Sequence, residues 1–222
     1  MNDTKDTAGN VGSFLENHKG IIIIISAIII AGIVGFLAYS GITKTLRKNG
    51  LEKLDVLTVE LTKAESEDEV DASVVDDILT RAKALADSSN GVVATRAYMF
   101  AADIDFANKN WEYSKESWLN AAKASESAYT APICYYNAAV CSEEVGNIDD
   151  AIAYYTIAVG KESFSLAPRA YFNIGRIEEQ RGGFEAAEKA YNTLVDNYAG
   201  NEWANLAKSR LLTLKAEGKL AN

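Results

Sequence analysis

The chain has 222 residues, of which 48% are hydrophobic and 24% are charged, and its formal net charge is −9. It contains only two prolines, and this composition favours a folded helical domain over a disordered chain. The acidic balance argues against nucleic-acid binding, because the phosphates of nucleic acids require a basic surface.

A polar tail at residues 1–20 precedes the most apolar stretch of the chain. Residues 21–39 read IIIIISAIIIAGIVGFLAY and carry no charge, and Lys19 and Lys44 bracket them. At about 1.5 Å per residue this stretch forms a helix about 28 Å long, which matches the hydrocarbon core of a bilayer. The sequence therefore predicts a transmembrane helix.

A cleaved signal peptide is the alternative interpretation of this stretch. Ala38 and Ser40 form a small-x-small pair before Gly41, which would permit cleavage after Ser40. The apolar run is longer than the core of a usual signal peptide, and the region before it is nearly neutral. We therefore expect an uncleaved anchor.

The region after the predicted span is expected to be helical. Residues 40–64 predict a juxtamembrane helix, and Asn49–Gly50 is a candidate break in it. An acidic run at 65–73 predicts a loop, and the apolar positions of residues 74–86 fall on one face of a further helix.

Three segments then repeat, with starts at Thr95, Pro132 and Pro168 that lie 37 and 36 residues apart. Each segment has an aromatic residue at its fourth and twenty-fourth positions, a small residue at its eighth and twentieth, and a turn between them. The aligned residues are Tyr98, Tyr135 and Tyr171 (fourth); Ala102, Ala139 and Gly175 (eighth); Lys109, Gly146 and Gly182 (turn); Ser114, Ala151 and Ala187 (twentieth); and Trp118, Tyr155 and Tyr191 (twenty-fourth). Small residues allow two helices to approach closely, and aromatic residues fill the gaps between units.

This pattern resembles the tetratricopeptide repeat (TPR), a helix–turn–helix unit of 34 residues. The resemblance implies an all-α fold, in which the transmembrane helix is followed by an α-solenoid of about three repeats and a C-terminal capping helix. The expected domain covers residues 74–222. The expected repeats lie near 95–128, 132–165 and 168–200, and the expected cap covers 201–218.

The sequence offers no catalytic or metal-binding constellation. Its one histidine, His18, lies beside the predicted span, so the domain lacks a His-based triad or His metal site. Adjacent acidic residues such as Glu143–Glu144 and Glu178–Glu179 point about 100° apart on a helix and predict solvated faces. We expect no enzymatic activity, no cofactor, no metal ion and no small-molecule substrate.

The two cysteines are Cys134 and Cys141. Seven positions on one helix separate them by about 10.5 Å along its axis, which is too far for a disulfide. Their apolar surroundings predict buried structural thiols.

In the TPR family, positions two, five, nine and twelve of each unit line a concave surface that is formed by the first helices. The resemblance carries these positions onto Arg96, Met99, Asp103, Phe106, Ile133, Tyr136, Val140, Glu143, Arg169, Phe172, Arg176 and Glu179. This mixture of apolar and charged residues suits a peptide or helix of a protein partner. The alternative is that several of them, notably Tyr136 and Phe172, belong to the core between helices.

The motif FLENHKG before the span, followed by a basic collar and about three repeats, is also similar to the YfgM-type family of single-span proteins. This resemblance implies an ancillary translocon subunit with an extracytoplasmic repeat domain, which assists protein export or folding. Its implied partners are translocon subunits or envelope chaperones. An adaptor in another cell-envelope complex, such as outer-membrane assembly or division, and a cytoplasm-facing scaffold remain alternatives.

Two arguments about orientation disagree. Lys5 and Lys19 precede the span, whereas four basic residues follow it: Lys44, Arg47, Lys48 and Lys53. The positive-inside rule alone places the repeat domain in the cytoplasm, although long C-terminal domains translocate despite flanking charge. Following the family resemblance, we predict a single-pass protein of the inner (cytoplasmic) membrane, with its N-terminus cytoplasmic and its repeat domain outside.

Overall fold

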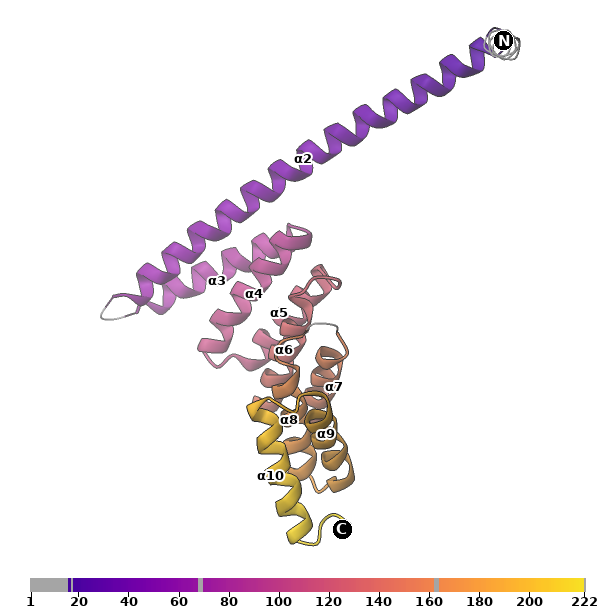
Figure 1. Ribbon diagram of the computed structural model, residues 1–222. Coiled ribbons are helices and arrows are strands. Elements are labelled where there is room, and N and C mark those ends of the chain that lie inside the picture. Colours follow the sequence, from indigo (N-terminus) through magenta and orange to yellow (C-terminus); the bar gives the residue numbers. More distant parts are fainter. Residues whose placement is uncertain (1–15, 17, 68–69, 162–163, 222) are drawn as a thin grey trace, which may run out of the picture. The chain divides into compact units, whose positions relative to one another are not determined.

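The computed structural model describes residues 16, 18–67, 70–161 and 164–221. Over these residues it contains nine α-helices and no strand, so the predicted all-α fold is confirmed (Figure 1). The chain divides into two compact units, Met1–Asn49 and Gly50–Asn222. Most of the predicted polar tail lies outside the described residues.

The first helix, α2, runs from Lys19 to Glu65 without interruption. The predicted break at Asn49–Gly50 is therefore wrong. Gly50 is buried because it faces Val93 of the repeat domain, and a Cβ added at Gly50 would lie only 2.7 Å from a Val93 methyl carbon. Here the glycine allows two helices to pack closely, and it does not form a turn.

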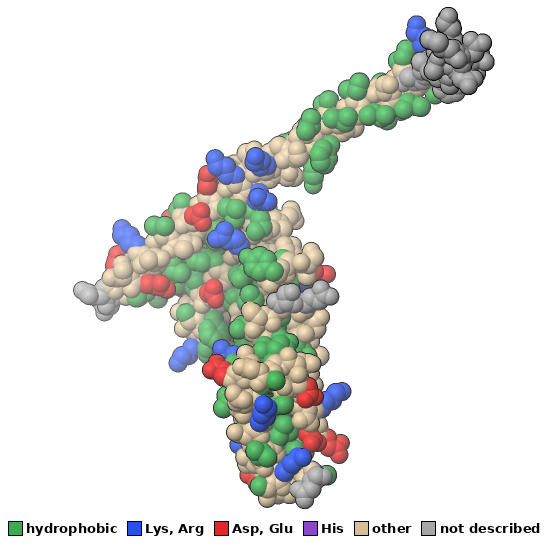
Figure 2. Space-filling view, in the orientation of Figure 1, with side chains coloured by type: hydrophobic (Ala, Val, Ile, Leu, Met, Phe, Trp, Pro, Cys, Tyr) green, Lys and Arg blue, Asp and Glu red, His purple; other side chains and the backbone are tan. Residues whose placement is uncertain are grey.

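Within the first unit, the apolar part of α2 exposes its side chains. It is long and apolar enough to cross a membrane, and none of its most apolar window is buried (Figure 2). Ile21 is 58% exposed and Phe36 is 69% exposed. Exposed apolar surfaces of this extent mark sites of interaction with membranes or with other proteins.

The second unit begins with the last four turns of α2. Leu54 and Leu57 of α2 are buried against α3 (Ala72–Asp87) and α4 (Gly91–Ala107). The compact unit therefore starts at Gly50, whereas the sequence placed the start of the repeat domain at residue 74.

The remaining helices stack in chain order (Figure 1). Three helical hairpins follow α3, and a single helix ends the stack. They are α4 with α5 (Trp111–Ala124), α6 (Ala131–Glu144) with α7 (Ile148–Val159), α8 (Ala167–Gln180) with α9 (Phe184–Asn197), and lastly α10 (Glu202–Ala216).

All three hairpins turn in the same way. Lys109, Gly146 and Gly182 have positive φ angles of 60°, 76° and 83°. One residue later, a backbone N–H donates over 2.8 Å to the carbonyl five residues before it, as in a Schellman motif, and Asn110 to Asp105 is the first example. The structure confirms that Lys109 occupies the glycine position. The helix α10 ends with the same motif at Gly218 (φ 68°).

The small and aromatic positions of one unit pack against each other. A Cβ on Gly175 would lie 2.4 Å from the Tyr191 ring, and the Ser114 hydroxyl donates over 2.8 Å to the carbonyl of Ala102. The twenty-fourth-position aromatics thus fill space inside their own hairpins as well as between units. The cysteines are unpaired and buried as predicted, and burial raises the pKa of the Cys134 thiol to about 12.

Candidate partner-binding surface

The first helices of the hairpins, α4, α6 and α8, together with α10, form a surface that we call the first-helix face. All twelve predicted groove residues lie on α4, α6 and α8. The exposed members are Arg96, Asp103, Phe106 and Arg169; the half-buried members are Met99, Ile133, Val140, Glu143, Phe172, Arg176 and Glu179. Tyr136 is buried, with 4% exposure, so the core alternative holds for this residue.

Charged residues join neighbouring first helices in a repeating arrangement. Arg176 of α8 pairs with Glu143 of α6, and one unit later Arg210 of α10 pairs with Glu179 of α8. Each carboxylate also accepts a hydrogen bond from the twenty-fourth-position tyrosine of its unit, over 2.7 Å from Tyr155 and 3.1 Å from Tyr191. We call each set of glutamate, arginine and tyrosine a rung. Glu143, Arg176 and Glu179 therefore hold helices together, which the sequence did not predict.

The contacts within the rungs shift the pKa values of their glutamate and tyrosine side chains. The guanidinium of Arg210, followed by the hydroxyl of Tyr191, lowers the pKa of the Glu179 carboxyl below its usual value. Burial, reinforced by the hydrogen bond to Glu143, raises the pKa of Tyr155. Both shifts favour an ionised glutamate and a neutral tyrosine, which is the protonation pattern that the hydrogen bonds require.

Arg169 is a charged residue of this face that belongs to neither rung. Its guanidinium carbon lies 5.9 Å from the ring centre of Tyr136 on α6 and 5.6 Å from that of Trp203 on α10. Trp203 in turn packs against Phe172, with ring centres 5.3 Å apart. Among the described residues no carboxylate pairs with Arg169. The sequence reasoning missed Trp203, because it treated α10 only as a cap.

Several acidic residues expected on solvated faces are structural instead. Glu178 is 5% exposed and accepts two hydrogen bonds of 2.6 Å from the Arg181 guanidinium. Arg181 also pairs with Asp149 at the start of α7 over 3.0 Å, so it connects two successive units. Over the described part of the chain, no group of three or more His, Cys, Asp or Glu residues is placed to hold a metal ion.

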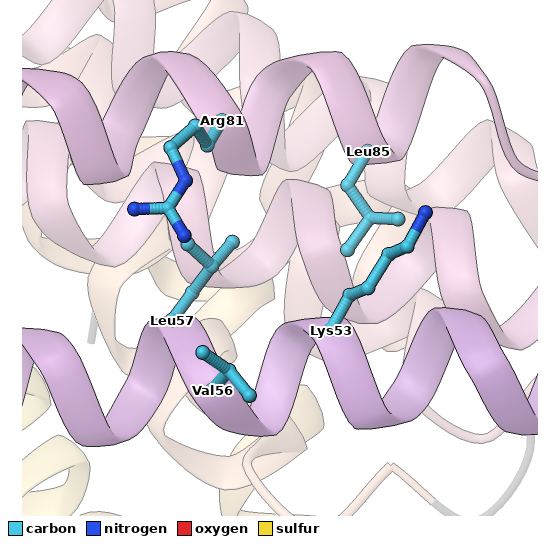
Figure 3. Close-up of a pocket in the computed structure, with 5 residues that line it drawn as sticks. All are labelled: Lys53, Val56, Leu57, Arg81 and Leu85. Atoms are coloured by element: carbon cyan, nitrogen blue, oxygen red, sulfur yellow. The ribbon is translucent and has the colours of Figure 1, made fainter.

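Two shallow hollows lie away from the first-helix face. One, of about 310 Å³, lies between α2 and α3 and is lined by Lys53, Val56, Leu57, Arg81 and Leu85 (Figure 3). Arg81 is already engaged there, because it donates to Glu60 over 2.6 Å and to Asp77 over 3.1 Å. The other, of about 350 Å³, lies between α9 and α10 beside the exposed Leu212. Neither hollow gathers unpaired charge and aromatic rings as the first-helix face does.

Comparison with known proteins identifies the family of the chain. A sequence model of the tetratricopeptide repeat family matches residues 143–202. A "TPR repeat-containing protein" of Treponema pallidum (strain Nichols) is 30% identical over 235 residues, which cover 98% of each chain. The chain belongs to the tetratricopeptide repeat family. This TPR protein is also similar to the crystal structure of MamA, with a TM-score of 0.49 and 14% identity over 66% of this chain and 81% of that one.

Proposed function

We propose that this TPR protein is a membrane-anchored scaffold that binds a segment of a partner protein on its first-helix face. The observation that carries the proposal is Arg169, an exposed cation held against Tyr136 and Trp203 without a carboxylate partner in the described structure. A cation over aromatic rings keeps its positive charge available, and such a group binds a carboxylate with adjacent apolar surface. Phe172 supplies this apolar surface beside Trp203.

The anchor in this proposal is the apolar part of α2. Its length, composition and exposure fit a membrane-spanning helix. Anchoring confines the repeat domain to a membrane surface, where it meets partners that are themselves in or near the membrane.

The finer proposal is that this scaffold assists protein export or folding, with translocon subunits or envelope chaperones as partners. It is supported by the order of tail, apolar span, basic collar and repeats along the chain. The same order of segments would also suit an adaptor in another envelope complex. The excess of basic residues after the span favours a third form of the proposal, a scaffold that faces the cytoplasm.

Crosslinking in native membranes tests these proposals. The full chain is purified in mild detergent after chemical crosslinking, and its partners are identified by mass spectrometry. We expect export-machinery subunits with the wild type and with Lys189→Gln, which removes an exposed cation from α9, and their loss with Arg169→Gln. Absence of such subunits from the wild-type crosslinks would overturn the export proposal. An unchanged partner set in Arg169→Gln would show that the first-helix face is not the binding surface.

A further inference from the structure

The last helix, α10, repeats the pattern of α4, α6 and α8. Arg210 of α10 pairs with the glutamate at position twelve of the preceding unit, as Arg176 of α8 does one unit earlier. This equivalence makes α10 the first helix of a fourth unit, with Arg210 at position nine. Position three supports the alignment, because it is a fully buried small residue in every unit: Ala97, Cys134, Ala170 and Ala204.

In each complete hairpin, the second helix and the turn before it cover positions eight and eleven of the first helix. Position eight is buried, and position eleven is at most 5% exposed. The residues are Ala102, Ala139 and Gly175 (eighth) and Asp105, Ser142 and Glu178 (eleventh). In the third hairpin, the ring of Tyr191 on α9 lies against Gly175. A Cβ on Gly183, which precedes α9, would lie 2.6 Å from a carboxylate oxygen of Glu178.

The equivalent residues of α10 have no such cover. Ser209 at position eight is exposed, and Leu212 at position eleven is 69% exposed. Asn205 at position four is exposed as well, whereas the tyrosines at this position of the three hairpins are half-buried. Within the described part of the chain, α10 packs against α8 and α9, and no helix covers this side of it. Helical stacks end in a polar outer side, whereas Leu212 places an apolar side chain there.

The uncovered side of α10 borders the hollow of about 350 Å³ between α9 and α10. Leu211 and Leu212 line the hollow together with Lys208 and Lys215, and Glu188 is the acidic residue of its lining. Among the described residues, neither lysine pairs with a carboxylate. The repeat domain is acidic as a whole, so this end of it has a local charge of opposite sign.

The exposed side of α10 and the hollow form a surface that we call the cap face. Its residues are Asn205, Lys208, Ser209, Leu211, Leu212 and Lys215 of α10 with Glu188 of α9. It is distinct from the surface around Arg169. The residues that α10 contributes to that surface face α8, because Trp203 packs against Phe172 and Arg210 pairs with Glu179.

The cap face has the features that receive a second helix in the complete hairpins. The small side chain of Ser209 leaves room for an aromatic ring, as Gly175 does for Tyr191. Leu212 offers an apolar contact beside it. Lys208 and Lys215 are seven positions apart, which is about 10.5 Å along the axis of α10. Two carboxylates with the same spacing on an antiparallel helix match both lysines.

A second copy of the cap face fits poorly as the occupant. Two copies related by a two-fold axis would place identical patches against each other. Each patch carries two lysines and one glutamate, so the contact would bring like charges together. An acidic helix of another protein meets Lys208 and Lys215 with the opposite charge instead.

We propose that the cap face binds an acidic amphipathic helix of a second partner protein. This helix packs antiparallel to α10, in the place of the second helix of a fourth hairpin. Its aromatic residue lies over Ser209, and its carboxylates pair with Lys208 and Lys215. The site goes beyond the proposed function, because it does not use Arg169, and it allows the scaffold to hold two partners at once.

A library of helices tests the proposal. A phage-displayed helical scaffold with one randomised face is selected against the full chain in lipid nanodiscs. The enriched helix is then synthesised as a stapled peptide, and its affinity is measured by fluorescence anisotropy. We expect the enriched sequences to carry an aromatic residue and two acidic residues that are seven positions apart.

Leu212→Glu should weaken binding of this peptide at least about tenfold, because it places a carboxylate in the apolar part of the cap face. The melting temperature should stay unchanged, since the side chain is exposed. Ile157→Glu is the matched control, an equivalent change at an exposed apolar residue of α7. Both Ile157→Glu and Arg169→Gln should leave binding unchanged.

Exchange of charges tests the role of the lysines. Lys208→Glu combined with Lys215→Glu should weaken binding of the acidic peptide about tenfold or more. A peptide in which lysines replace the two acidic residues should bind this double variant more tightly than it binds the wild type. Lys123→Gln, which removes an exposed cation from α5, is the control with unchanged binding.

The outcomes separate this site from the proposed function. The proposal is overturned if no enriched helix loses affinity in Leu212→Glu, or if the exchanged charges restore no binding. A peptide that loses affinity in Arg169→Gln but not in Leu212→Glu would lie on the first-helix face, which supports the proposed function and overturns the cap-face site. Mass photometry covers the remaining case: wild-type dimers that Leu212→Glu separates would show that a second copy occupies the cap face, which also overturns the proposal.

Discussion

Lys109 is the residue at which the first repeat departs from the other two. It holds a left-handed backbone conformation that Gly146 and Gly182 adopt in the equivalent turns. A left-handed conformation costs a residue with a Cβ about 1–2 kcal/mol, whereas glycine adopts it freely. The first hairpin therefore carries local backbone strain that its two neighbours avoid.

Lys109→Gly should stabilise the chain by about 1 kcal/mol, because it removes this strain. Chemical denaturation of the full chain in detergent, followed by circular dichroism, measures the change. Lys115→Gly is the matched control in the interior of α5, where glycine should destabilise by about 1 kcal/mol. If both substitutions changed the stability in the same direction, this would contradict the strain assigned to Lys109.

Gly175→Ala should destabilise the third hairpin by about 1–3 kcal/mol through overpacking. The added methyl group would lie 2.4 Å from the Tyr191 ring, which is fully buried. Gly160→Ala is the control, because a Cβ there meets its nearest neighbour at 3.4 Å. A melting temperature of Gly175→Ala that equals that of the wild type would show that α8 and α9 are not packed this closely.

At the scale of the helices, the rungs connect each first helix to the next. The carboxylates are 19% and 14% exposed and the guanidinium groups 35% and 42% exposed, so the rungs lie between core and solvent. Substitution of one residue of such a pair leaves the charge of the other residue unpaired and poorly solvated. Single substitutions therefore report on the contribution of the pair to stability.

Acidification should weaken the rung that attaches α10. Arg210 lowers the folded-state pKa of Glu179, so its stabilisation is fully present above the usual glutamate value of 4.5 and is lost as pH falls through the lowered pKa. The stability difference between wild type and Glu179→Gln should therefore be present at about pH 7 and shrink toward zero below about pH 4. A difference that stays constant over this range would contradict the shift.

Arg176→Glu should destabilise by about 1–3 kcal/mol, because it places a second carboxylate beside Glu143 and removes the charged donor. The exchanged pair, Glu143→Arg with Arg176→Glu, should recover part of the loss. Thermal unfolding of the three variants measures the coupling. If the exchanged pair were no more stable than the sum of the single changes, the ion pair would not contribute to stability.

At the scale of the whole molecule, an apolar unit and an acidic repeat unit share one continuous helix. Residues 54–222 contain 16 basic and 27 acidic residues, whereas the segment after the span is basic. For the membrane-anchored scaffold proposed above, the charge bias and the resemblance to YfgM-type proteins give opposite orientations. The orientation would decide which set of partners the first-helix face meets.

A membrane-impermeant protease added to spheroplasts should digest residues 54–222, because we place the repeat domain outside the cytoplasm. Protease added after membrane lysis serves as the control for accessibility. Protection of the domain until lysis would reverse the orientation and favour the cytoplasm-facing scaffold.

The sequence by itself determined the features that depend on spacing and composition. The 36- and 37-residue periods located the hairpins, and the alignment placed Lys109 at the turn position that two glycines occupy in the other repeats. The unpaired state of Cys134 and Cys141 followed from their separation along one helix, and their burial followed from their apolar surroundings. These features are local, so chain order alone specifies them.

Only the tertiary structure decided which charged residues are already engaged. Glu143 and Arg176 are 33 residues apart, and Glu179 and Arg210 are 31 apart, so neither pair follows from helical periodicity. The aromatic contacts of Arg169, the burial of Gly50 against Val93 and the unpartnered indole of Trp118 likewise arise from contacts between separate helices. The sequence could list the groove positions, but a side chain is free to bind only if its neighbours leave it unpaired, and packing sets those neighbours.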